Sequence, residues 1–141
     1  MAGMKTLLRV AIVVAAMLAP ALTHAQVKQP IYVAECKAQD SDVVGRGLCS
    51  GLRDALAKSP RYALLTGPGK EFHYVVLVSS TPIAGSASAS SVVFGFAVGE
   101  GEMRFLGHQV LATGNHQIDG QVADLLGDLD ALMDAVKKAT P

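Results

Sequence analysis

The sequence predicts a single α+β domain, and two kinds of pattern support this fold class. Five stretches are rich in β-branched and aromatic residues, which is typical of strands. Two further stretches carry apolar residues every three or four positions, which is typical of helices packed on a core. Their order along the chain is β-α-β-β-β-β-α. We therefore expect a mainly antiparallel sheet of four to five strands with both helices on one face.

The first strand and the first helix are expected near the start of this domain. Residues 31–35 (IYVAE) follow Pro30 and form a short β-rich run. Apolar residues then recur at helical spacing until Ser59-Pro60 ends the pattern. We expect Asp40 or Ser41 to cap this helix, with Asp42 in its first turn.

Three glycines interrupt the predicted first helix, namely Gly45, Gly47 and Gly51. Each lowers helix propensity by about 1 kcal/mol relative to alanine. Close packing of the helix against a sheet would compensate for this loss, and we expect that packing here.

The remaining elements follow in a regular succession. Strands are expected at 61–66, 72–81, 92–98 and 103–113, and an amphipathic helix is expected over 119–138. Residues 82–91 (PIAGSASASS) are small and polar and are expected to form a long loop. Residues 72–81 are apolar on both faces, which is typical of a central strand.

The N-terminal segment has the pattern of a secretory signal peptide. Lys5 and Arg9 precede an uncharged apolar run, Pro20 interrupts it, and small residues stand at the positions that a signal peptidase reads before Gln26. The run is shorter than the roughly 20 residues of a membrane-spanning helix. We expect cleavage of residues 1–25, a single domain over 26–141, and a periplasmic or secreted protein with no membrane span after cleavage.

The charge of the domain excludes one class of partner. The chain carries 12 basic and 12 acidic residues; without Lys5 and Arg9 the balance is 10 to 12, or about −2. Nucleic-acid binding depends on clustered basic residues that neutralise phosphates. We therefore expect no nucleic-acid partner.

The export signal predicts that the two cysteines, Cys36 and Cys49, reach an oxidising compartment. An oxidising compartment favours a disulfide between two such residues, and we expect this bridge. Two buried thiols are the alternative.

The layout of the chain resembles the small periplasmic α+β domains of the TolB amino-terminal and CsgG type. The resemblance rests on the leading strand 31–33, the helix end 57–64 (AKSPRYAL), the run 74–78 (YVVLV), two further strands and a closing amphipathic helix. It implies a domain that binds a protein or peptide partner in the cell envelope and does not turn over a substrate.

From these patterns we expect a non-enzymatic binding domain whose partner is another envelope or secreted protein, with no cofactor and no metal. The expected contact region is the loop that carries Ser86, Ser88, Ser90 and Ser91, because long loops on rigid scaffolds often carry recognition. Strand addition at the sheet edge is a further expected mode.

Two alternatives of other classes stay open. The first is a small hydrolase or metal-dependent enzyme that uses His73, His108 and an aspartate. The second is a secreted inhibitor whose inserting loop lies between Cys36 and Cys49 and is stiffened by their disulfide.

Overall fold

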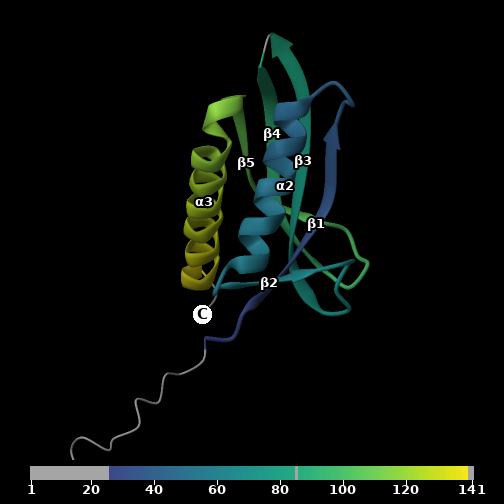
Figure 1. Ribbon diagram of the computed structural model, residues 1–141. Coiled ribbons are helices and arrows are strands. Elements are labelled where there is room, and N and C mark those ends of the chain that lie inside the picture. Colours follow the sequence, from purple (N-terminus) through teal and green to yellow (C-terminus); the bar gives the residue numbers. More distant parts are fainter. Residues whose placement is uncertain (1–25, 85, 140–141) are drawn as a thin grey trace, which may run out of the picture.

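The computed structural model describes residues 26–84 and 86–139, so the expected signal peptide lies outside the described residues. The elements are β1 (Gln29–Ala38), α2 (Val43–Lys58), β2 (Tyr62–Leu65), β3 (Phe72–Ala84), β4 (Ala87–Val98), β5 (Arg104–Gly114), a short 3-10 turn η1 (Asn115–Gln117) and α3 (Ile118–Ala139). The strands form one sheet in the order β2-β1-β3-β4-β5. Figure 1 shows α2 and α3 side by side on one face of this sheet. The predicted α+β class and element order are confirmed.

The sheet contains two parallel and two antiparallel strand pairs. β1 runs parallel to both β2 and β3, whereas β3, β4 and β5 form an antiparallel meander. Most of the paired residues belong to the antiparallel meander, as expected, and the chain reaches the parallel position of β3 through the short strand β2. Because this strand has only four residues, the short connection 66–71 is enough to carry the chain back across β1 to the start of β3.

The core lies between the sheet and the two helices. Each helix contributes one apolar stripe to it, and the strands contribute every second side chain. The fully buried helical residues are Leu48, Leu52 and Leu56 from α2, with Leu125, Leu129 and Met133 from α3. No helix within 26–84 and 86–139 is long and apolar enough to cross a membrane.

The glycines of α2 serve two different contacts. A Cβ on Gly45 would lie 2.3 Å from side-chain oxygens of Asp42 and Ser80, so this glycine allows α2 to approach β3. A Cβ on Gly47 would lie 2.8 Å from Ile118, and one on Gly51 would lie 3.1 Å from Val122. The expected packing against the sheet is therefore correct for Gly45, whereas Gly47 and Gly51 pack against α3.

Acidic residues of α3 anchor both edges of the sheet. The Tyr62 hydroxyl at the start of β2 donates to Asp130, and Arg61 pairs with Asp134. At the other edge, the Gln109 amide on β5 donates to Asp128. Burial, together with donation to Asp130, raises the pKa of Tyr62. These contacts fix α3 across the width of the sheet.

Candidate functional site on the helix-free face

The serine-rich segment is not the loop that the sequence suggests. β3 continues to Ala84 and β4 begins at Ala87, so residues 82–84 and 87–91 lie in the two paired strands at the end of a long hairpin. Ser88 and Ser90 are buried, while Ser86 is exposed near the turn. The prediction of a loop is wrong because residues 87–91 pair with β5 as well as with β3, and these backbone ladders outweigh the low strand propensity of small residues.

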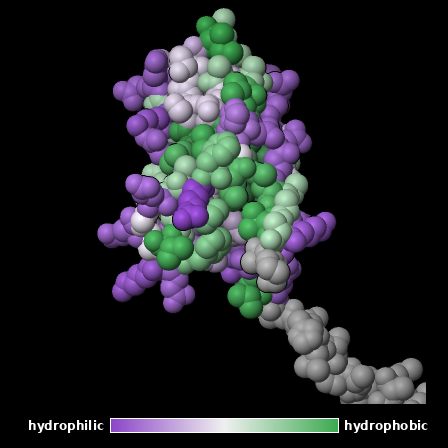
Figure 2. Space-filling model, turned by 180° about the vertical axis from the view of Figure 1, so that it is seen from behind, coloured by the Kyte–Doolittle hydropathy of each residue, from purple (hydrophilic) through white to green (hydrophobic). Residues whose placement is uncertain are grey.

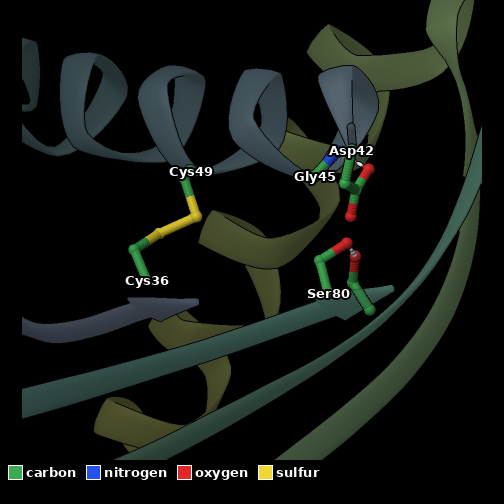
Figure 3. The surroundings of a disulfide bond; sticks show 6 residues. Cys36, Asp42, Gly45, Cys49 and Ser80 are labelled. Carbon is green, nitrogen blue, oxygen red and sulfur yellow. Dashed lines mark hydrogen bonds between the residues drawn. A yellow bond between two sulfur atoms is a disulfide. The ribbon is translucent and has the colours of Figure 1, made fainter. Parts of the chain in front are cut away.

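The buried serines hold the start of α2 on the hairpin. Asp42 is 1% exposed, and its Oδ1 accepts hydrogen bonds from the Gly45 amide at 2.7 Å and from the Ser88 hydroxyl. Ser90 donates to Ser80 at 2.9 Å, and Figure 3 shows Ser80 facing the Asp42 carboxylate. Asp42, and not Asp40 or Ser41, is therefore the N-cap of α2. Ser88 and Ser90 have an internal role that removes them from any surface that contacts a partner.

The environment of Asp42 favours its ionised form. Burial by itself would raise the pKa of this carboxyl, but hydrogen bonds from Ser88, from the Gly45 amide and from Ser80 outweigh burial and lower the pKa below its ordinary value. The group is thus a charged cap at a helix N-terminus, where the helix dipole also favours negative charge.

The disulfide expected between Cys36 and Cys49 is present. It joins β1 to α2 with the two Cα atoms 6.0 Å apart, as Figure 3 shows. β1 ends at Ala38 and α2 begins at Val43, so only Gln39 to Asp42 lie outside regular structure within the disulfide loop. Because this segment is short and Asp42 is buried, it offers no long inserting loop of the kind that the inhibitor alternative requires.

The two histidines of the enzyme alternative lie apart. His73 on β3 pairs with Ala97, and His108 on β5 pairs with Val93. The two partners are four residues apart on β4, or about 13 Å along the strand, and the histidines are two strands apart. His73 is buried and His108 is exposed. No group of three or more metal-ligating side chains occurs in the described part of the chain.

The sheet face opposite the helices, called here the helix-free face, is strongly apolar. Register and alternation place the following side chains on it: Tyr32, Ala34, His73, Val75, Leu77, Val93, Ala97, Phe105, His108 and Val110. Phe105 is 61% exposed and Val110 is 73% exposed. Figure 2, seen from this side, shows apolar side chains along the middle of the face and hydrophilic ones at its flanks.

A pocket of about 410 Å³ lies on this face over β1, β3 and β4. Its floor is made of strand residues that include Tyr32, Val75 and Leu77. The connection 66–71 contributes Pro68, and the turn after β4 contributes residues 99–101 and Met103. His73 also lines the pocket, and its Nδ1 lies 3.0 Å from the Glu71 carbonyl oxygen.

The edge strand β5 borders the same face. It has eleven residues and pairs with β4 on one side, and it is the last strand in the sheet order. The opposite edge, β2, has four residues. The described residues therefore leave one long edge free, next to the exposed side chains of Phe105 and Val110.

Sequence reasoning missed this pocket and the apolar second face. The signal is present in residues 72–81, whose two apolar faces indicate burial on both sides, whereas the helices of the described residues cover one face. A second apolar face without a helix to cover it predicts a binding surface.

No family model matches the chain, and no curated protein matches it. Among solved structures, a minor lipoprotein from Acinetobacter baumannii matches with 16% identity and a TM-score of 0.40, over 75% of this chain and 93% of that chain. The element layout expected from the TolB amino-terminal and CsgG resemblance is present in the structure. A relationship to those domains stays a prediction.

Proposed function

We propose that this chain is an exported accessory protein of the cell envelope, without enzymatic activity, that binds another envelope or secreted protein through β5 and the helix-free face. The free β5 edge beside exposed apolar side chains is the observation that carries this proposal. Large apolar side chains that stand together on a surface mark an interaction site more often than isolated ones do.

The mode of binding is strand addition. An edge strand presents unpaired N–H and C=O groups, and an extended partner segment pairs with them. Because side chains alternate along a strand, every second residue of the partner segment lies on the helix-free face, next to Phe105 and Val110. The partner is therefore an extended polypeptide segment with apolar residues at alternate positions.

Two features support export. The segment 1–25 has the residue pattern of a signal peptide, and the Cys36–Cys49 disulfide is typical of oxidising compartments. The mass of the protein recovered from the periplasm or medium tests this: a chain beginning at Gln26 with no titratable thiol is expected. An uncleaved chain or two free thiols would contradict export.

The partner experiment uses a charge placed on the edge strand. Immobilised wild type and Val110→Asp are incubated with envelope extract, and bound proteins are identified by mass spectrometry. A bound protein is expected to be lost with Val110→Asp, because a carboxylate on the helix-free face opposes apolar contact and is costly to desolvate. Hydrogen exchange of the wild-type complex is expected to slow in β5.

The matched control is Val43→Asp. Val43 is 62% exposed at the start of α2, so it receives the same substitution away from the helix-free face. Retention of the partner by Val110→Asp, or its equal loss with Val43→Asp, would overturn the proposed interface. If the purified wild type dimerises through β5 and captures no other protein, the edge binds a second copy of the chain. That result would overturn the proposal of an envelope or secreted partner.

A further inference from the structure

The pocket on the helix-free face has polar groups of its own, and none of its lining residues belongs to β5. Its volume of about 410 Å³ lies within the roughly 300–1,000 Å³ range of small-molecule pockets, and its lining is largely apolar. Besides the Tyr32 hydroxyl, two polar side chains contribute to this lining, His73 from β3 and Glu100 from the turn after β4. What these two groups offer to a ligand decides which ligand fits.

The hydrogen bond of His73 fixes the role of its second nitrogen. The Glu71 carbonyl oxygen can only accept, so Nδ1, at 3.0 Å, carries the single proton whenever the ring is neutral. Nε2 is then a hydrogen-bond acceptor, and no described residue donates to it. His73 is 1% exposed, so this acceptor belongs to a buried ring that lines the pocket.

The backbone of the surrounding turns offers few donors to a ligand. The Gly99 amide donates to the Glu71 carbonyl oxygen at 3.1 Å, and the Gly101 amide donates to the Val98 carbonyl oxygen at 3.2 Å. Both N–H groups are therefore used within the protein. The Glu100 carboxylate between them is exposed and is an acceptor only.

The two segments that border the pocket are acidic when taken together, because 66–71 is neutral and 99–103 carries two glutamates. Residues 66–71 and 99–103 carry Glu71, Glu100 and Glu102 against Lys70, a net charge of −2. An apolar cavity that has the Glu100 carboxylate in its lining is complementary to an apolar body that carries a cationic donor.

We propose that this pocket binds a small amphipathic amine. The apolar body occupies the floor formed by Tyr32, Val75 and Leu77, and the ammonium group donates to His73 Nε2 and to the Glu100 carboxylate. The inference goes beyond the proposed function, because it concerns another part of the helix-free face and another class of ligand.

The test is a binding titration with matched probes on the purified chain. Phenethylamine is compared with 3-phenylpropionate, which has a similar apolar body and the opposite charge. The methyl signal of Met103, which lines the pocket, reports binding by NMR, and that of the fully buried Met133 on the other face of the sheet is the internal control. Saturable binding of the amine with a dissociation constant of about 10 mM is expected for so small a probe.

Variants then locate the site. Ala34 lines the pocket and is exposed, so Ala34→Trp fills the cavity with little risk to folding, and at least about ten-fold weaker amine binding is expected. Ala112→Trp is the control, because Ala112 is exposed on β5 outside the pocket lining. Glu100→Gln is expected to weaken the amine about three-fold, as for an exposed ion pair, and to leave the carboxylate probe no weaker.

Each outcome bears on the proposal. Preference for the amine by about ten-fold or more, lost in Ala34→Trp and kept in Ala112→Trp, supports it. Equal or tighter binding of the carboxylate, unchanged binding in Ala34→Trp, or no saturation by the amine would overturn it. These measurements use no protein partner, so they fail or succeed independently of strand addition at β5.

Discussion

The two faces of the sheet differ in how their apolar side chains are covered. Phe94 on β4 points toward the helices and is 1% exposed, whereas Phe105 on the neighbouring strand β5 points away from them and is 61% exposed. Exposing either side chain to water costs about 25 cal/mol per Å² of apolar surface. On the helix side α2 and α3 remove that surface from water. On the other side the described residues supply only two short segments, 66–71 and 99–103.

The two short segments cover only part of the helix-free face. They leave a pocket over Tyr32, Val75 and Leu77, and His73 also lines it. Toward β5 the cover ends, and Phe105 and Val110 are exposed. The helix-covered face thus determines the stability of the fold, and the helix-free face is where binding would gain free energy from apolar burial.

The largest expected effect comes from the covered face. Phe94→Ala removes a fully buried aromatic side chain from the core and is expected to lower the free energy of unfolding by about 3–5 kcal/mol. Urea unfolding followed by circular dichroism measures the change. A loss below about 1 kcal/mol would mean that the helices do not hold this face as tightly as its burial indicates.

The disulfide is expected to come next. The double variant Cys36→Ala/Cys49→Ala releases the link between β1 and α2 and is expected to lose about 3 kcal/mol, since the bridge restricts the unfolded chain. Thermal unfolding of the variant beside the oxidised wild type measures this. Amine binding at the helix-free face is expected to persist wherever the variant is folded; its loss would contradict the independence of the two faces.

The buried cap is expected to contribute less. Asp42→Ala removes the N-cap and leaves the Ser88 hydroxyl without its acceptor, for a combined loss of about 2 kcal/mol at neutral pH. Ser41→Ala is the matched control, because Ser41 is the exposed neighbour and does not cap the helix. Equal losses in the two variants would contradict the assignment of the cap.

The effect of Asp42 also depends on pH with a definite sign. Its pKa in the folded protein is lowered, while the unfolded value is about 3.9. The contribution of ionised Asp42 is therefore complete above about pH 4–5 and is lost as the pH falls through the folded-state pKa. The stability difference between wild type and Asp42→Ala is expected to shrink in urea unfolding at about pH 3. A difference that grows on acidification would contradict the lowered pKa.

The smallest expected effect lies on the helix-free face. Phe105→Ala is expected to change the free energy of unfolding by no more than about 0.5 kcal/mol, because the side chain is 61% exposed in the folded protein. The same denaturation experiment as for Phe94→Ala measures it. A loss as large as that of Phe94→Ala would show that Phe105 is covered in the free protein and would remove it from the proposed interface.

Local pattern was sufficient to predict the class and order of the elements. The apolar spacing of α2 and α3 and the β-rich runs of all five strands lie within the sequence of each element, so no partner is needed to recognise them. The pairing of Cys36 with Cys49 also followed from the sequence, because two cysteines behind the pattern of an export signal predict one intramolecular disulfide.

Other features depend on which elements meet. The serines of 82–91 indicate a loop by composition, yet their burial is decided by the contact of α2 with the β3–β4 hairpin, where Asp42 accepts from Ser88. The parallel pairing of β1 with β2 and β3 is likewise decided by the tertiary structure, because strands that are far apart in sequence must pair.

The sequence by itself determined the α+β class, the order of its strands and helices, and the residues of the disulfide, because each is encoded by periodicity or residue type over short stretches. Only the tertiary structure decided which sheet face the two helices cover. That choice buries Phe94 and exposes Phe105, and it brings His73 and Glu100, 27 positions apart in sequence, to one pocket. The physical reason is that burial and hydrogen bonding between distant residues depend on packing, which no local pattern records.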